Sequence, residues 1–224
     1  MVLGIYGASG LGREVEIIAR KINNLEHRWE RIVYVDDNES ITEVLGIPSY
    51  TFDKARDIFP DLELSIAIGE PSIRERLYNK AKNVGLKLAT LIHPGVYIDE
   101  SCKIGEGVTI CEGVTITSCV VLESNVYIHP HVVIGHDIHI GQHSIIGASV
   151  VIGGANEIGE RVFIGFIAGT LQGLKIGNDV QISAGSIVFR DIEAGMIVMG
   201  NPARGIRRNE GRGVFSSKAP KKDD

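Results

Sequence analysis

The sequence lacks the features that mark membrane, secreted and nucleic-acid-binding proteins. It has no apolar run of the roughly 20 residues that a transmembrane helix needs, and no basic segment followed by an apolar stretch stands at its start. Its formal net charge is -5, whereas a protein that binds nucleic-acid phosphates needs a basic face. These absences predict a cytoplasmic protein with neither a nucleic acid nor a membrane as its partner.

Cysteine is also scarce. The three cysteines, Cys102, Cys111 and Cys119, are an odd number and form no C-x-x-C pair. This spacing argues against both a disulfide framework and a structural zinc site. We therefore expect no bound metal.

Residues 1–91 alternate short apolar runs with helical patterns. The runs "LGIY", "IVYVDD" and "LSIAIG" read as strands, and apolar residues recur at helical spacing in one stripe of Leu11, Val15, Ile18 and Ile22 and another of Ile73, Leu77, Ala81 and Val84. This alternation predicts a small Rossmann-like α/β domain with a parallel sheet.

A glycine-rich loop, "GASGLG", joins the first strand of this domain to its first helix. Gly7, Gly10 and Gly12 place backbone N–H groups and a helix N-terminus where they can receive phosphate, and Asp36 and Asp37 close the second strand, where a carboxylate can bond a ribose. About 91 residues hold only one mononucleotide half of a dinucleotide-binding fold, so a single nucleotide is expected rather than NAD.

A different period begins at Ile98. The first position of successive hexads, from 98 to 188, is Ile, Leu or Val in 15 of 16 cases, with Thr170 as the exception, and glycine takes the second position eight times. A period of six that buries one apolar residue per short strand is typical of a solenoid of stacked parallel strands. Glycine is expected to serve its turns. The tail over 207–224 has no periodicity and is expected to be flexible.

Five of the seven histidines fall within 15 residues of this solenoid: His129, His131, His136, His139 and His143. His136 stands at a predicted corner and is followed by Asp137. Neutral imidazole is the side chain best suited to accept a proton near pH 7, and an adjacent carboxylate can orient the ring. His136 is therefore the candidate general base, with Asp137 as its partner.

The hexads resemble the hexapeptide-repeat acyltransferases. "GASGLG" in front, "LIHP" at the junction and "GNPAR" behind extend the resemblance to the sialic acid O-acetyltransferases and the nucleotide-amino-sugar N-acetyltransferases of bacterial surface-glycan synthesis. The resemblance implies an all-β left-handed parallel β-helix over 92–206 and a homotrimer. It implies acetyl transfer from acetyl-CoA to the amino group, or the hydroxyl, of a sugar that is linked to a nucleotide.

The same resemblance assigns site residues. It gives His136 and Asp137 the catalytic role, and it places acetyl-CoA in a groove between subunits with contacts at Gly154, Phe166 and Ala184. It assigns the nucleotide-sugar contacts of the front domain to Ser9, Gly10, Asp36, Asp37 and Gly69.

The chain departs from the family pattern at three positions. Related enzymes often have histidine in place of Leu11 and of Ile145, and asparagine in place of His129. His129 and His143 are candidate compensating donors.

Three alternatives stay open. One is a sialic acid O-acetyltransferase, because the same base serves either nucleophile. Another is a zinc enzyme like the γ-type carbonic anhydrases, because His131 and His136 have the five-residue offset of such a site. The last is a non-catalytic trimer that binds a nucleotide sugar.

Overall fold

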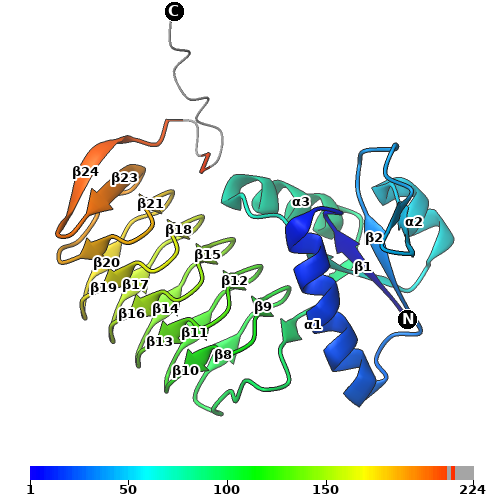
Figure 1. The fold of residues 1–224 in the computed structure, drawn as a ribbon, viewed down its shortest axis with the longest axis horizontal. Coiled ribbons are helices and arrows are strands. Elements are labelled where there is room, and N and C mark those ends of the chain that lie inside the picture. The colour runs from blue at the N-terminus through cyan, green and yellow to red at the C-terminus, as the bar shows by residue number, and fades with distance from the viewer. Residues whose placement is uncertain (211–212, 215–224) are drawn as a thin grey trace, which may run out of the picture.

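A computed structural model of the chain describes residues 1–210 and 213–214. The chain forms an α/β domain followed by a column of short strands (Figure 1). Among the described residues, no helix has both the length and the apolar character that crossing a membrane requires.

The α/β domain is a six-stranded sheet in the order β3-β4-β2-β1-β5-β6, parallel except for the hairpin of β3 and β4. The strands are β1 Val2–Tyr6, β2 Arg31–Val35, β3 Glu43–Val44, β4 Ile47–Tyr50, β5 Leu62–Ile66 and β6 Lys87–Leu88. The helices are α1 Gly10–Glu26, α2 Phe52–Ile58 and α3 Pro71–Asn83.

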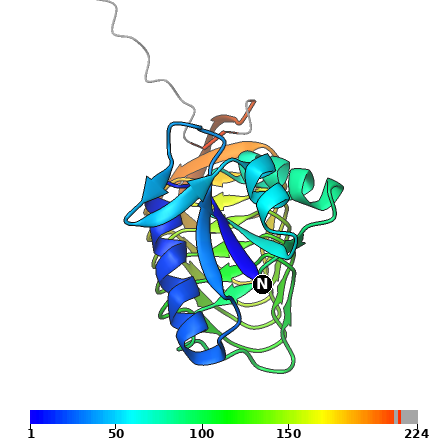
Figure 2. The ribbon, with the colours of Figure 1, turned by 90° about the vertical axis from the view of Figure 1, so that its right-hand side faces the viewer.

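The two faces of this sheet have different partners. Leu3 and Ile5 of β1 pack in the same cluster as α1, whereas Val2 and Tyr6 pack with α2 and α3 on the opposite face. Figure 2 shows the domain standing at one end of the strand column. Because α1 is on the face toward the column, its apolar stripe is shared between the two parts of the chain.

The predicted stripe of the first helix is confirmed for Val15, Ile18 and Ile22, which are buried in α1. In α3 the prediction is partly wrong: Val84 lies beyond the helix and is exposed, and the buried side includes Arg74 beside Leu77 and Ala81.

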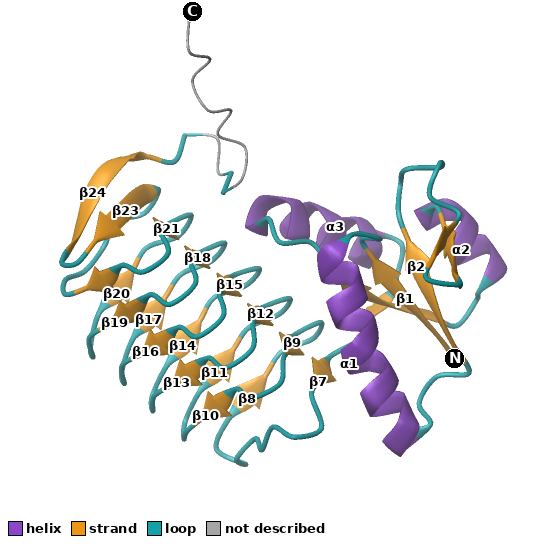
Figure 3. Cartoon of the chain, viewed as in Figure 1, coloured by secondary structure: helices purple, strands orange, loops and turns teal. Residues whose placement is uncertain are grey.

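The strand column is a β-helix of three parallel sheets, confirming the predicted solenoid (Figure 3). Residues pair across 18 positions, as Val133 with Val151, so three hexads make one coil. Sheet C contains β7 Leu91–Ile92, β9 Thr109–Ile110, β12 Tyr127–Ile128, β15 Ile145–Ile146, β18 Phe163–Ile164 and β21 Gln181–Ile182. Sheet D contains β8 Lys103–Ile104, β11 Val121–Leu122, β14 His139–Ile140, β17 Glu157–Ile158 and β20 Lys175–Ile176. Sheet E contains β10 Thr115–Ile116, β13 Val133–Ile134, β16 Val151–Ile152, β19 Gly169–Thr170 and β22 Ile187–Val188.

The first hexad position points into the column and forms one continuous apolar core. Thr170, the exception in the sequence, pairs with a second buried polar residue, because Asn156 Nδ2 donates to Thr170 Oγ1 at 3.1 Å. Asn156 Oδ1 also accepts the Leu174 N–H at 3.0 Å. The two exceptions therefore satisfy each other, as buried polar groups must.

The eight glycines at the second hexad position allow neighbouring coils to stack closely. The expectation that they make the turns is wrong. The fourth position of every hexad, from 107 to 185, has a φ between 54° and 73°, whether or not the residue is glycine. None of the eight second-position glycines has a positive φ. A Cβ at Gly141 or Gly147 would instead come within 3 Å of the backbone of the next coil. The second position is small because the coils touch there.

The three corners of the column are named here by the sheets that they join. Corner ED follows sheet E and contains residues 135–137, corner DC contains residues 141–143, and corner CE contains residues 147–149. Each corner repeats every 18 residues along the column.

The last coil is closed by a hairpin of β23 Met196–Gly200 and β24 Ala203–Arg208, with "GNPAR" at its turn. Arg207 and Arg208, which were assigned to a flexible tail, instead pair with β23 and belong to this hairpin. Beyond it, Asn209 donates to the Asp179 carbonyl at 3.3 Å. Residues 211–212 and 215–224 lie outside the described residues.

Candidate active site

His136 and Asp137 form a hydrogen-bonded pair on corner ED. His136 Nδ1 lies 2.7 Å from Asp137 Oδ2, and each side chain is 62% exposed. Because a carboxylate only accepts hydrogen bonds, Nδ1 carries the proton and Nε2 is left with a free lone pair. Asp137 holds a left-handed backbone conformation with φ 55°, which aspartate tolerates better than most residues. The ring is thus oriented as a base that faces outward.

Gly154 lies directly over His136 in the next coil, as the 18-residue period predicts. A Cβ at position 154 would come 2.7 Å from His136 Nε2 and 2.8 Å from Cε1. The absence of a side chain at Gly154 therefore keeps the basic edge of the ring open.

Phe166 and Ala184 stack on corner CE, since Gly185 N–H donates to the Phe166 carbonyl at 2.8 Å. Phe166 is exposed and meets the ring of His129 edge to face, with centroids 5.9 Å apart. Within one chain, these two predicted cofactor contacts therefore lie on corner CE, whereas His136 lies on corner ED.

The other histidines divide between the surface and the interior. His139 pairs with Glu123 at 2.9 Å on the outer side of sheet D. Burial, helped by the Arg74 guanidinium, lowers the pKa of His129 and of His143 to about 4, so both rings are neutral at pH 7. His143 Nδ1 lies 2.9 Å from Asn125 Nδ2 in the interior between the two domains, which does not place it as a donor beside His136.

The predicted nucleotide contacts lie at one edge of the α/β sheet. Ser9 and Gly10 follow β1, Asp36 and Asp37 follow β2, and Gly69 follows β5. This is the carboxyl edge of the parallel strands, beside the point where the strand order reverses, which is where open α/β sheets bind ligands.

The glycines of the loop have separate structural reasons. Gly7 has φ 120°, and a Cβ at Gly12 would collide with the Gly7 carbonyl. Gly10 differs, because a Cβ there would approach only the Arg13 guanidinium, at 3.9 Å. Open space therefore lies over the first turn of α1, where a phosphate would approach backbone N–H groups.

The two aspartates already have partners in the chain. Asp36 accepts the Ala8 N–H through Oδ2 and the Asn38 N–H through Oδ1, each at 3.0 Å, which fixes the loop.

Asp37 accepts a hydrogen bond from the Tyr6 hydroxyl at 2.6 Å and from Lys80 Nζ at 3.1 Å. Burial alone would raise the pKa of Asp37, but these two donors lower it overall. Asp37 is therefore held ionised beside the crevice.

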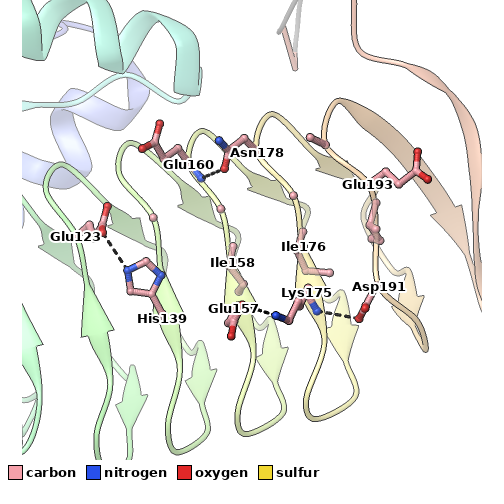
Figure 4. Close-up of a pocket in the computed structure, with 15 residues that line it drawn as sticks. Glu123, His139, Glu157, Ile158, Glu160, Lys175, Ile176, Asn178, Asp191 and Glu193 are labelled. Carbon is pink, nitrogen blue, oxygen red and sulfur yellow. Dashed lines mark hydrogen bonds and ion pairs between the residues drawn. The ribbon is translucent and has the colours of Figure 1, made fainter.

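A groove on the outer side of sheet D carries charged pairs and lies away from the predicted site residues (Figure 4). Glu157 pairs with Lys175 at 3.2 Å, and the Lys175 N–H donates to Asp191 at 2.9 Å. Within the described part of the chain, no three histidine, cysteine or acidic side chains are grouped so as to hold a metal ion. His131 and His136 lie on different edges of the column.

Sequence reasoning missed two cations: Arg74, which bonds to the β-helix, and Lys80, which bonds to Tyr6 and Asp37 within the α/β domain. Arg74 and Lys80 are both on α3, which was read from its apolar residues alone. The available indication was the position of Arg74, three residues before Leu77 and seven before Ala81, in line with the apolar stripe. A charged residue in such a stripe indicates a buried polar partner.

Comparison with known families separates the same two parts. Residues 2–81 match the PglD N-terminal domain, residues 89–118 and 119–154 match the bacterial transferase hexapeptide, and residues 156–190 match the hexapeptide repeat of succinyl-transferase. The match to the 2,3,4,5-tetrahydropyridine-2,6-dicarboxylate N-acetyltransferase of Clostridium perfringens is 44% identical over 50 residues. It covers 22% of this chain and only 21% of that relative.

Solved structures match over nearly the whole chain. PerB from Caulobacter crescentus, in complex with CoA and GDP-perosamine, is 28% identical with a TM-score of 0.84, covering 92% of this chain and 98% of that one. The acetyltransferase domain of PglB from Neisseria gonorrhoeae, in complex with acetyl coenzyme A, is 28% identical with a TM-score of 0.85 and the same coverage. Variants of the perosamine enzyme with one histidine replaced were also solved with CoA and GDP-perosamine.

Proposed function

We propose that this chain, which belongs to the left-handed β-helix sugar acetyltransferases with a PglD-type N-terminal domain, transfers acetyl from acetyl-CoA to the amino group of a nucleotide-linked sugar. The observation that carries the proposal is the His136–Asp137 pair, whose free Nε2 faces outward under Gly154. The proposed location is the cytoplasm.

The reaction needs a proton to leave the acceptor nitrogen. The amine lone pair attacks the thioester carbonyl carbon, a C–N bond forms and the C–S bond breaks. His136 Nε2 takes the proton from nitrogen, and the CoA thiolate leaves and is protonated in turn. Asp137 keeps Nδ1 protonated and stabilises the imidazolium. A base placed in this way contributes on the order of 10²- to 10⁴-fold in rate.

The three outer faces of the column support a homotrimer. Sheet C is covered by the α/β domain, where Tyr127, Ile145 and Phe163 are buried against α1, and sheet D is charged. Sheet E instead exposes Val133 and Val151. Exposed apolar side chains at both of its edges extend this patch: Phe166, Ile167, Leu171 and Phe189. Several exposed apolar side chains on one face and its edges are typical of a protein interface.

A three-fold axis facing sheet E would complete the site. Corners ED and CE are the two edges of sheet E, so closed rotation about such an axis brings corner ED of one chain beside corner CE of the next. His136 of one chain then meets Phe166 and Ala184 of its neighbour. This arrangement would explain why His136 is apart from Phe166 and Ala184 within one chain. Acetyl-CoA is proposed to lie between corner ED of one chain and corner CE of the next.

The front domain is proposed to bind the nucleotide of the acceptor at Ser9, Gly10, Asp36, Asp37 and Gly69. Their common sheet edge and the open space over Gly10 support this role.

The test is thiol release from acetyl-CoA with UDP-, GDP- and dTDP-linked 3- and 4-amino sugars and free sialic acid, run beside His136→Ala. Turnover on an amino sugar that falls at least about 100-fold in the variant is the expected result. Turnover on sialic acid alone would make the chain an O-acetyltransferase. Acetyl-CoA binding with no turnover on any acceptor would support a non-catalytic role, and stoichiometric zinc required for activity would support the hydratase alternative.

A further inference from the structure

Arg74 is a fully buried cation at the boundary between the α/β domain and the β-helix. Its side chain is 0% exposed, and none of the described carboxylates forms an ion pair with it. Desolvation lowers its pKa to about 10, which leaves the guanidinium charged at pH 7. A buried charge without a counter-ion is costly unless hydrogen bonds satisfy it.

The hydrogen bonds of Arg74 go to both domains. Nη1 donates to the carbonyls of Ile66 and Ile68, the latter at 3.2 Å, and Nη2 donates to Oδ1 of Asn125 at 2.8 Å and to its carbonyl at 2.9 Å. The guanidinium also lies 5.4 Å from the ring centroid of Tyr127. One planar group therefore joins the end of β5 to a corner of the β-helix.

Asn125 is fully committed to this junction. Its Nδ2 donates to the Arg74 carbonyl at 3.2 Å and lies 2.9 Å from His143 Nδ1, which accepts because the ring is neutral. His143 packs against Tyr78 of α3, with ring centroids 5.1 Å apart. Because every polar atom of the amide is used, the junction has one arrangement of donors and acceptors.

The Ile66 and Ile68 carbonyls belong to the segment that leads to Gly69, a proposed nucleotide contact. Resting on the proposed function, we infer that Arg74 is a positioning residue for the acceptor: it fixes residues 66–69 against Asn125, and so sets the height of the bound sugar along the column. A displacement of about 1 Å in a reacting group can cost about 100-fold in rate.

The alternative is that Arg74 only stabilises the fold. Replacing a buried charge network by apolar residues is often neutral or stabilising. At this junction such a replacement would leave the Ile66 and Ile68 carbonyls without a donor and would put an apolar residue at φ 60° of Asn125, so Arg74→Met is used alone and is assayed well below its own melting temperature. Arg74→Lys keeps the charge but loses the planar fork that reaches two carbonyls and one amide at once.

The matched control is Arg161→Lys. Arg161 Nη1 also joins α3 to the β-helix through Glu75 at 2.9 Å, but its other partners are Glu160 and Asp179, not residues 66–69. A general loosening of the domain boundary would affect both arginine variants alike.

The experiment measures kcat and KM for both substrates, the melting temperature, and hydrogen exchange of the amides at 66–69. Arg74→Lys is expected to lower acceptor kcat/KM by 10- to 100-fold, to leave the acetyl-CoA KM within twofold, and to speed exchange at 66–69 but not in β1. Arg161→Lys is expected to leave the acceptor kcat/KM within threefold. Arg74→Met is expected to melt below the wild type, because buried carbonyls lose their donor, and, while folded, to lose at least as much acceptor kcat/KM as Arg74→Lys.

Full acceptor turnover in folded Arg74→Met would overturn the inference, as would a rise in the acetyl-CoA KM as large as the loss of acceptor kcat/KM, or unchanged exchange at 66–69 in Arg74→Lys. The proposed function is tested separately by turnover of the wild-type chain. If that chain acetylates no sugar, the exchange measurement still decides whether Arg74 holds residues 66–69.

Discussion

Gly154 covers the ring of His136 so closely that a Cβ at position 154 would lie 2.7 Å from Nε2. The ring is the far end of a side chain and can rotate away, so a methyl group there moves the base without breaking the coil. Position 154 does not need glycine for its backbone, because the left-handed φ of this corner is at Ala155. The close contact with His136 explains the glycine instead.

Gly154→Ala is accordingly expected to lower turnover by at least about tenfold and to change the melting temperature little, because only the direction of Nε2 changes. Steady-state kinetics beside a thermal melt checks this. A large loss of stability with full activity per folded molecule would show that Gly154 serves the coil and not the base.

Gly10→Glu is expected to abolish nucleotide binding while preserving the fold. The position is open, and glutamate is favourable in the first turn of α1, but its carboxylate would occupy the space of the diphosphate and repel it. Titration of UDP, GDP and dTDP into the wild type, Gly10→Glu and the neutral control Gly10→Gln separates charge from size. Equal binding by Gly10→Glu and the wild type would remove the loop from the acceptor site.

Two kinds of glycine in the β-helix are expected to respond differently to substitution. Gly141→Ala places a Cβ within 3 Å of the next coil and should cost about 1–3 kcal/mol of unfolding free energy. Gly173→Asn should cost less than about 1 kcal/mol, because position 173 has φ 73°, which asparagine tolerates, and open space around it. Urea unfolding measures both, and equal costs would contradict the stacking explanation.

The stability of the chain is expected to fall as pH drops from about 6.5 toward 4. The pKa of His143 is about 4 in the folded chain and near 6.5 when unfolded, so within this window the unfolded state binds more protons. His143 can contribute up to about 3 kcal/mol to this loss. His143→Gln, which keeps an acceptor for Asn125, should reduce the slope of unfolding free energy against pH without removing it, because the pKa of His129 is also about 4 in the folded chain. An unchanged curve would place the titration elsewhere.

The architecture could be predicted from the sequence because each half has a regular pattern of apolar residues. An apolar residue at every sixth position has to face a common interior, and the structure puts those residues there, together with the one polar residue in the series, Thr170. The candidate base was also predictable, since His136–Asp137 is a local pair whose chemistry does not depend on distant residues.

What joins the two halves could not be predicted in the same way. The bond between Arg74 and Asn125 spans 51 positions, and neither residue belongs to a motif. The glycine pattern was visible, but its cause was misread, because the distance between coils is a property of the stacked chain. The separation of His136 from Phe166 and Ala184, by contrast, was predictable, because a coil of 18 residues stacks positions 136 and 154 at one corner and positions 166 and 184 at another.

The most direct test of the shared site mixes two inactive chains. His136→Ala lacks the base, and Ala184→Trp fills the proposed acetyl-CoA contact on corner CE, so each alone should be inactive on the amino sugar that the wild type uses. Denatured together and refolded, they should regain about a quarter of wild-type turnover, the share of interfaces in a random trimer that pair an intact His136 of one chain with an intact Ala184 of the next. Mixed trimers confirmed by mass that stay inactive would contradict a site completed between chains.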